Sequence, residues 1–316
     1  MKLIHIGLPK TGSTSFQSQW YKRNDINLVS DGLNTLVEET RKAIKIETDP
    51  NLLLDLWPKA LGKQSITLYS SEGLSGIPWG NQTSEHKYDY GHYLFANLCK
   101  ENVPDGKVLV FIRSPESWLR SVYFQMIHEG KNFGFTRFIR HQRSYIANIL
   151  NLNDFLKHWD DAFGEDNVIV YPFERLISSP DVANQEISTS LGIPPALNLF
   201  QLQQQSNASL NSESAQLLRA ASIFNRRIQG PSNNLANTFN KLNEDMRLLY
   251  RVELQRRPRA FGFSKELLSP LNFSLPEVER KFLKVLIQDG FLAEIIRRGD
   301  KYKIAETYQT RVEQHF

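Results

Sequence analysis

Short apolar runs that alternate with helix-like stretches limit most strongly how this 316-residue chain can fold. Near-continuous apolar runs bounded by polar turns are typical of strands buried on both faces of a parallel sheet. Helical patterns such as Tyr93–Leu98 and Phe155–Trp159 lie between them, and this alternation predicts an α/β fold with right-handed crossovers. The expected strands are Lys2–Ile6, Ile26–Val29, Ser65–Tyr69, Lys107–Ile112 and Val168–Tyr171.

The pattern changes after Ser178, where strand-like runs disappear. Residues 215–224 and 276–296 are predicted to form amphipathic helices, and Ser274, Pro276 and Glu277 are start signals for the second. Residues 230–234 form a predicted turn. We expect a single domain over residues 1–316, with an α/β core over 1–176 and a mainly helical extension over about 177–316. A separate helical domain is the alternative.

Composition excludes several classes of protein. Hydrophobic residues make up 41% of the chain and charged residues 23%, which excludes collagen, low-complexity disorder and coiled coil. The net charge of +4 suits an anionic ligand but is too small for a nucleic-acid partner. The single cysteine, Cys99, excludes an intrachain disulfide and fits a reducing compartment. Without a targeting or membrane segment, we expect a soluble cytoplasmic protein with no integral membrane contact.

The first apolar run leads directly into Gly7–Phe16, a stretch rich in glycine and hydroxyl residues. Its place between a strand and a helix is where a phosphate-binding loop belongs. Glycine frees the backbone, successive N–H groups can face inward, and the helix presents its positive end. A plain Ser/Thr helix cap is the alternative, but the density of hydroxyls beside Lys10 and Gly12 makes it weaker.

A nucleotide kinase would carry G-x-x-x-x-G-K-[S/T] at this point. Gly7 and Gly12 keep the glycine spacing and Thr14 fills the last place, but Ser13 stands where the lysine belongs. That lysine normally reaches the β- and γ-phosphates of a nucleoside triphosphate. The run Lys107–Ile112 is also followed by an arginine rather than by an aspartate that binds magnesium. The pattern disfavours a conventional ATPase or kinase.

Pro9–Thr14, with the sequence P-K-T-G-S-T, resembles the P-K-x-G-[S/T]-[S/T] loop of a transferase family. This is the sulfotransferase family that uses 3′-phosphoadenosine-5′-phosphosulfate (PAPS), in which the loop follows the first strand. The family also places an arginine after a later strand and a serine on the next helix. Arg113 and Ser121 keep that spacing, and Ser114-Pro115 supplies a helix N-cap and first residue.

Further segments resemble bacterial and carbohydrate-type members of the family. They are Tyr69–Leu74, where related enzymes carry the catalytic base, and Phe163–Leu176. The resemblance covers residues 1–176 and thins beyond them to Asn207–Leu210. It implies a P-loop-like three-layer α/β fold, in which a central, mostly parallel sheet is flanked by helices and followed by a helical C-terminal extension.

The resemblance also implies roles for individual residues. Lys10 would stabilise negative charge on the leaving phosphate, and Arg113 and Ser121 would bind the 3′-phosphate. PAPS would be the co-substrate and 3′-phosphoadenosine-5′-phosphate (PAP) the product, with no metal. Gly12, Ser13 and Thr14 would hold the 5′-phosphate with the assistance of Ser15. Lys10 and Thr11 complete the cofactor-binding residues expected in this loop.

Glu72 is the candidate general base for the acceptor hydroxyl, because it lies just beyond a predicted strand. A surface carboxylate, or one placed near a helix N-terminus, is the alternative. Some members of the family use a histidine base, which makes His128, His92 and His5 rivals. His128 follows Ser121 by seven residues on the same predicted helix, so it can face the cofactor.

Other clusters carry less weight. An arginine cluster near Pro258 can bind an acidic glycan or the cofactor, but a charge run is usually a solvated face. The same two interpretations apply to the basic group at 137–143. Aromatics after Glu72 can form a sugar-stacking wall, although such density is more often core. These groups are Arg251, Arg256, Arg257 and Arg259; Arg137, Arg140, His141 and Arg143; and Trp79, Tyr88, Tyr90, His92 and Tyr93.

The function predicted from the sequence is transfer of a sulfuryl group from PAPS to an acceptor hydroxyl, with a carbohydrate or glycan as the first choice. A small phenol or alcohol, a peptide tyrosine and a lipid follow in that order. A P-loop kinase and a non-catalytic nucleotide-binding protein are the alternatives. The sequence does not indicate an oligomeric state.

Overall fold

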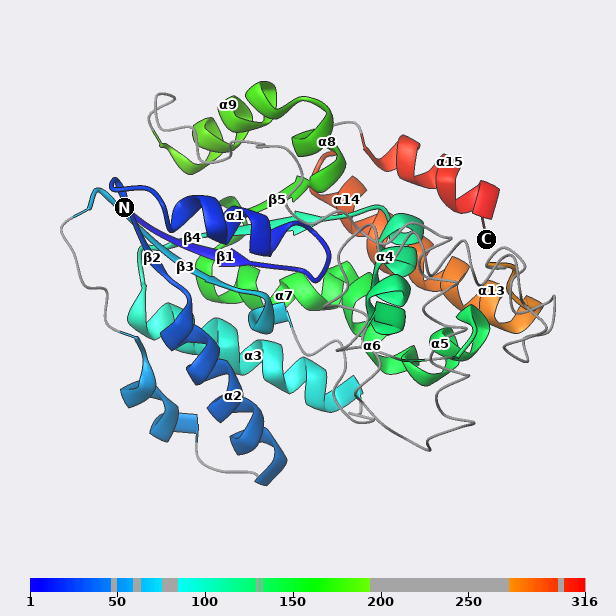
Figure 1. Cartoon of the computed structure of the whole chain (residues 1–316), viewed down its shortest axis with the longest axis horizontal. Coiled ribbons are helices and arrows are strands. Elements are labelled where there is room, and N and C mark those ends of the chain that lie inside the picture. The colour runs from blue at the N-terminus through cyan, green and yellow to red at the C-terminus, as the bar shows by residue number, and fades with distance from the viewer. Residues whose placement is uncertain are drawn as a thin grey trace, which may run out of the picture. The chain divides into compact units, whose positions relative to one another are not determined.

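A computed structural model describes residues 1–46, 50–58, 64–75, 85–128, 131, 133–193, 273–300 and 304–315. Its centre is a five-stranded sheet in the order β2-β3-β1-β4-β5, and every neighbouring pair is parallel (Figure 1). The strands are β1 (Lys2–Ile6), β2 (Ile26–Val29), β3 (Ile66–Ser71), β4 (Lys107–Ile112) and β5 (Val168–Pro172). The predicted α/β class is confirmed.

The first strand is central, and its carboxyl end sets the position of the candidate site. Ile6 pairs with Ser71 of β3 and with Val110 of β4, so β1 and β3 end side by side. The N–H of Gly7 donates to the Ser71 carbonyl over 3.3 Å. Chemistry-bearing loops of open parallel sheets lie at the carboxyl ends of the strands, near the point where the strand order reverses. The loop after β1 lies at such a point.

Helices cover both faces of the sheet (Figure 1). On one face, α1 (Ser13–Trp20), α8 (Phe173–Ser178) and α9 (Pro180–Leu191) bury Phe16, Trp20, Leu176 and Ile187 against strand residues such as Leu109. The other face carries α2 (Asp31–Ile46), α3 (Glu85–Asn102) and α7 (Leu152–Phe163). This is the expected three-layer arrangement, and each strand is buried because both faces are covered.

The remaining described elements are mostly short helices. The predicted helical stretches 93–98 and 155–159 lie inside α3 and α7, and no strand follows β5 within the described residues. No described helix is long and apolar enough to cross a bilayer. The further elements are η1 (Pro50–Leu56), η2 (Glu72–Ser75), α4 (Pro115–His128), α5 (Phe135–His141), α6 (Arg143–Leu150), η3 (Glu165–Asn167), α13 (Glu277–Val285), η5 (Leu286–Leu292), α14 (Ala293–Arg297) and α15 (Ala305–His315).

The chain divides into two compact units, one of residues 1–118, 142–206 and 281–316 and the other of residues 119–141 and 207–280. The single domain with a core over 1–176 stays a prediction. The helix expected over 276–296 is present as α13, η5 and the first part of α14, and it begins at Glu277 as its start signals indicate. The helix expected over 215–224 and the turn over 230–234 lie outside the described residues.

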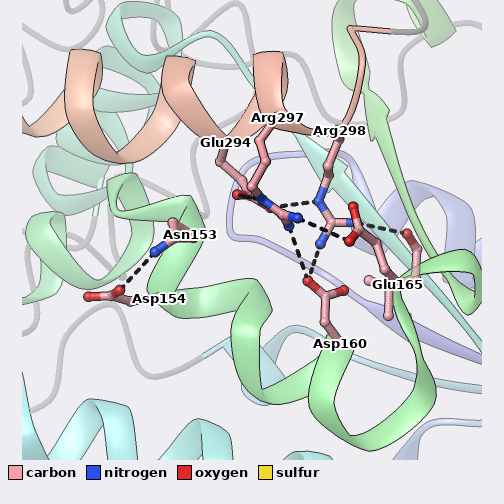
Figure 2. A network of polar contacts seen from close by, with 8 residues as sticks. Asn153, Asp154, Asp160, Glu165, Glu294, Arg297 and Arg298 are labelled. Atoms are coloured by element: carbon pink, nitrogen blue, oxygen red, sulfur yellow. Dashed lines mark hydrogen bonds and ion pairs between the residues drawn. The ribbon is translucent and has the colours of Figure 1, made fainter.

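Arginine–carboxylate pairs hold α14 against α7 and η3 (Figure 2). Arg298 donates to Glu294 and Asp160, and Arg297 donates to Glu294 and Glu165. The Glu294 side chain is only 1% exposed, and burial by itself would raise its pKa; the two guanidinium groups instead hold the pKa below its ordinary value. Because a buried carboxylate is costly without partners, these pairs fix the course of the chain toward α15.

Candidate functional site

The loop between β1 and α1 turns through two residues of left-handed backbone, Lys10 (φ 66°) and Gly12 (φ 82°). A side chain at Gly12 would be strained in that conformation, and its Cβ would lie 2.8 Å from the Phe173 ring. Within the loop, Thr11 donates to the Leu8 carbonyl from its N–H over 3.3 Å and from its hydroxyl over 2.6 Å. The Thr11 hydroxyl therefore closes the loop.

The N-terminus of α1 presents backbone donors at the end of this loop. The helix begins at Ser13, and the N–H of Phe16 donates to the Gly12 carbonyl over 3.1 Å. The N–H groups of Ser13, Thr14 and Ser15 precede that bond and have no acceptor within the helix. Gly12 is the N-cap and supplies no capping side chain. These donors and the positive end of the helix can hold an anion.

The loop's carbonyl oxygens are bonded to the protein. The Pro9 carbonyl accepts from the indole Nε1 of Trp118 over 3.0 Å, and the Lys10 carbonyl accepts from Nη1 of Arg113 over 2.9 Å. The Leu8 carbonyl is occupied by Thr11. Carbonyl oxygens repel an anion, so these bonds satisfy the loop's acceptors with protein donors and suit the loop to negative charge.

Ser13 has a fully buried side chain whose hydroxyl makes no regular hydrogen bond within the described part of the chain. It packs over Gly7, where an added Cβ would lie 2.4 Å from the Ser13 oxygen. The hydroxyl interacts with Glu72, whose pKa it helps to lower, so it would be shared between that carboxyl and a bound ligand. Of the other predicted loop ligands, Thr14 is exposed, and the side chain of Ser15 lies outside the described part.

Glu72 begins η2 at the end of β3 and lies beside the loop. A Cβ added to Gly7 would lie 3.0 Å from the Glu72 Cγ. Burial raises the pKa of Glu72, while the Lys10 charge and the Ser13 hydroxyl partly oppose the rise. The Ser75 hydroxyl lies 3.1 Å from the Gly7 carbonyl and ties η2 to the loop. A carboxyl with a raised pKa next to a cation is suited to proton transfer.

Arg113 follows β4 and contacts the loop directly. Besides its bond to the Lys10 carbonyl, its Nε donates to the Ser117 hydroxyl over 2.9 Å, and its guanidinium stacks on the Phe173 ring, 5.5 Å from the centroid. The group is half-buried, and burial lowers its pKa while Glu174 opposes that shift. The structure thus brings Lys10, Glu72 and Arg113 to the carboxyl edge of three adjacent strands.

The helix after Arg113 begins at Pro115 as expected, with Ser114 before it. Ser121 lies on this helix, and its buried hydroxyl has no regular hydrogen bond among the described residues. His128 ends the helix, and its side chain lies outside the described part of the chain. The roles predicted for Ser121 and His128 therefore stay predictions.

The other two rival histidines are buried and bonded to polar neighbours. The Nδ1 of His5 lies 2.8 Å from the Ser70 hydroxyl, and burial lowers the pKa of His5 to about 3. The Nε2 of His92 lies 3.0 Å from the Asn148 amide oxygen, and burial lowers the pKa of His92 to about 4. Both imidazoles are neutral at physiological pH, and both pack edge-on against aromatic rings.

Of the predicted sugar-stacking wall, Tyr90 and Tyr93 have exposed rings that stack on each other with centroids 6.3 Å apart. Trp79 and the Tyr88 side chain lie outside the described part, and so does the arginine cluster Arg251, Arg256, Arg257 and Arg259. In the second basic group, Arg137 donates to His141, Arg140 pairs with Glu279 and Arg143 stacks over Phe282. Each of these arginines has a protein partner.

Two residues near the site were not assigned a role from the sequence. Glu174 accepts from the Ser114 N–H over 2.9 Å and from the Tyr308 hydroxyl over 2.7 Å. The sequence feature that could have pointed to Glu174 is its place two residues after the end of β5, within the segment that resembles the sulfotransferase family. Tyr308, near the C-terminus on α15, had no local signal. Among the described residues, no group of three or more histidine, cysteine, aspartate or glutamate side chains is arranged to bind a metal ion.

Comparisons with known proteins returned structures only. No family model matches the chain, and no curated protein matches it. A sulfotransferase from Alicyclobacillus acidocaldarius has 16% identity and a TM-score of 0.43, with 74% of this chain and 98% of that chain covered. The sulfotransferase domain from the curacin biosynthetic pathway has 14% identity and a TM-score of 0.37, with 80% and 97% covered.

Mouse sulfotransferase SULT7A1, complexed with PAP, has 13% identity and a TM-score of 0.33, with 90% of this chain and 88% of that chain covered.

Proposed function

We propose that this protein is a sulfotransferase that moves the sulfuryl group of PAPS to an acceptor hydroxyl. The observation that carries the proposal is the pairing of an anion-binding loop with a partly buried carboxyl, that of Glu72. The N-terminus of α1 supplies backbone N–H donors together with the buried Ser13 hydroxyl. That hydroxyl lies beside Glu72, whose pKa is raised by burial. Phosphate binding alone does not require such a carboxyl.

The hydrogen-bond donors of the site suit a nucleotide with two phosphate groups. The N–H groups of Ser13 and Thr14 and the Ser13 hydroxyl would hold the 5′-phosphate, with Ser15 as a predicted further ligand. Thr11 would act through the loop, because its N–H and its hydroxyl both donate to the Leu8 carbonyl. Gly7 and Gly12 leave no room for a Cβ, because the added atoms would clash with Ser13 and Phe173, so glycine lets the loop pack closely against its neighbours. Arg113 would bind the 3′-phosphate, and Ser121 stays its predicted second ligand.

When bound, PAPS supplies an activated sulfuryl group whose transfer leaves PAP. The work of the chain is to align the partners and to stabilise charge on the departing phosphate. The Lys10 ammonium would stabilise that charge, because its charge already acts on Glu72 and so lies near the reacting centre. Glu72 in its ionised form would accept the proton of the acceptor hydroxyl as the hydroxyl oxygen attacks sulfur.

The acceptor we propose is a hydroxyl of a carbohydrate or glycan. Tyr69–Leu74 and Phe163–Leu176 support this class through their resemblance to carbohydrate-type members. The exposed, stacked rings of Tyr90 and Tyr93 on α3 also support it, since sugar rings pack on aromatic faces. We propose a cytoplasmic reaction without a metal.

Calorimetric titration with PAP and with ATP–magnesium, followed by transfer of labelled sulfate from PAPS to an acceptor panel, tests the proposal. We expect binding of PAP, and turnover that falls by orders of magnitude in Lys10→Ala while part of the PAP affinity remains. Binding of ATP–magnesium without binding of PAP would favour a kinase. PAP binding without transfer to any class of acceptor would favour a binding protein.

A further inference from the structure

The turn that carries Arg113 is held from a distant part of the chain. Glu174, the second residue of α8, places one carboxylate oxygen 2.9 Å from the Ser114 N–H. That N–H belongs to the peptide group that joins Arg113 to Ser114, so the bond fixes the backbone from which the Arg113 side chain departs. The Glu174 charge also acts directly on the Arg113 guanidinium and partly opposes the lowering of its pKa by burial.

The second oxygen of Glu174 accepts from the hydroxyl of Tyr308 over 2.7 Å. Tyr308 is buried, and burial together with Glu174 raises the pKa of Tyr308, so its hydroxyl keeps the proton that it donates. Both oxygens of the carboxylate therefore have a partner, and the carboxylate cannot swing away from the turn without breaking a charge-assisted hydrogen bond.

The helix that carries Tyr308 is itself fixed at its start. The Asp300 carboxylate accepts from the N–H groups of Ile304 and Ala305, at 2.7 Å and 3.2 Å, where α15 begins. Just before it, the Arg297 and Arg298 pairs hold α14 (Figure 2). A second contact from α15 reaches the same turn, where Arg311 lies 3.4 Å from the Ser114 hydroxyl.

We propose that Glu174 and Tyr308 are positioning residues for Arg113 and that through it they set the affinity for the 3′-phosphate of the bound nucleotide. The connected bonds run from Tyr308 to Glu174, from Glu174 to the Ser114 peptide, and from Arg113 to the Lys10 carbonyl. This inference rests on the proposed function, because it names the part of the nucleotide that the pair controls. In this proposal neither residue contacts the nucleotide; both act through Arg113.

The test compares PAP with adenosine 5′-phosphate, which lacks the 3′-phosphate, by calorimetry. In Tyr308→Phe we expect PAP to bind about three- to tenfold more weakly and adenosine 5′-phosphate to bind as in the wild type. In transfer assays the KM for PAPS should rise by a larger factor than kcat falls, because Arg113 binds the remote 3′-phosphate and reaches the reacting centre only through the Lys10 carbonyl. Glu174→Gln, which removes the charge as well as one acceptor oxygen, should lose more PAP affinity.

Tyr171→Phe is the matched control, since it removes another buried tyrosine–carboxylate bond of 2.6 Å, made to Glu186 instead of Glu174. Equal loss of PAP affinity in both tyrosine variants would overturn the proposal, and so would equal loss for the two nucleotides. Hydrogen exchange at the Ser114 amide gives a readout without ligand, and it should accelerate in Tyr308→Phe and Glu174→Gln but not in Tyr171→Phe. If wild-type protein binds no PAP, the proposed function fails; unchanged Ser114 exchange refutes the positioning role by itself.

Discussion

Replacing Gly12 by alanine tests the geometry of the anion-binding loop. The φ of 82° costs an L-residue about 1–2 kcal/mol. The new Cβ would also lie 2.8 Å from a ring carbon of Phe173 and 3.2 Å from one of Phe16, and forced packing of this kind costs about 1–3 kcal/mol. We therefore expect Gly12→Ala to lose about 2–5 kcal/mol of unfolding free energy.

Gly192→Ala separates the cost of backbone strain from the cost of the contacts with the two aromatic rings. Gly192 ends α9 with a φ of 69°, but among the described residues its added Cβ would meet only the Lys107 ammonium, at 3.9 Å. This variant should lose about 1–2 kcal/mol, from backbone strain alone. Urea unfolding of both variants gives the difference, which measures the contact with the two rings.

Calorimetry with PAP completes the assay for this loop. If the Gly12→Ala loop moves away from Phe173, the N–H groups at the start of α1 move with it, and we expect PAP binding to be lost. Gly192→Ala should bind PAP as the wild type does. Equal stability losses in the two variants, together with intact PAP binding by Gly12→Ala, would refute the reasoning.

Three further predictions concern titration and ion pairing. Because the pKa of Glu72 is raised, its ionised form is costly in the folded protein, so the contribution of Glu72 to stability is full below the unfolded pKa and falls as pH rises through the folded pKa. Glu72→Gln should therefore melt at a higher temperature at pH 8, yet lose about a hundredfold or more in turnover. An unchanged melting temperature or an unchanged turnover would contradict this prediction. His5, with a pKa of about 3, is neutral when folded, so stability should decrease as pH falls from 6.5 toward 3, by about 1.4 kcal/mol per pH unit, and urea titrations of His5→Gln should show a shallower slope. Arg298→Met leaves the buried Glu294 and the partly buried Asp160 with Arg297 as their remaining cation and should cost about 1–3 kcal/mol. Lys42→Met, which breaks an exposed pair with Glu39, should change the unfolding midpoint little.

The strands could be predicted where their ends coincide with a change from apolar to polar residues. The bounds of β1 and β4 agree with the predicted Lys2–Ile6 and Lys107–Ile112. The third strand was predicted over Ser65–Tyr69, but β3 runs over Ile66–Ser71. Its last residues are buried serines: Ser70 bonds to His5 and Gln17, and Ser71 donates to Asn34. Apolar periodicity cannot mark such an end, because these polar groups are satisfied by distant residues.

The same limit applies to the candidate site. Lys10, Glu72 and Arg113 each follow a strand directly, and parallel strand order brings such residues to one edge of the sheet. Their supports come from elsewhere: Trp118 lies on the next helix, and Phe173 and Tyr308 lie far along the chain. A local pattern could not predict these contacts, because they depend on how α4, α8 and α15 pack.

These supports explain how a lysine can occupy left-handed backbone at the centre of the loop. The peptide group before Lys10 is held through the Pro9 carbonyl by Trp118, and the peptide group after it is held through the Lys10 carbonyl by Arg113. Fixing both flanking peptides fixes φ and ψ of Lys10, which offsets the strain of its φ of 66°. A cation on such a rigid backbone needs little reorganisation when charge develops on a leaving phosphate. Arg113 therefore contributes to the proposed transfer twice, as a ligand of the 3′-phosphate and as the residue that holds Lys10 in place, and its substitution should not be additive with changes at Lys10.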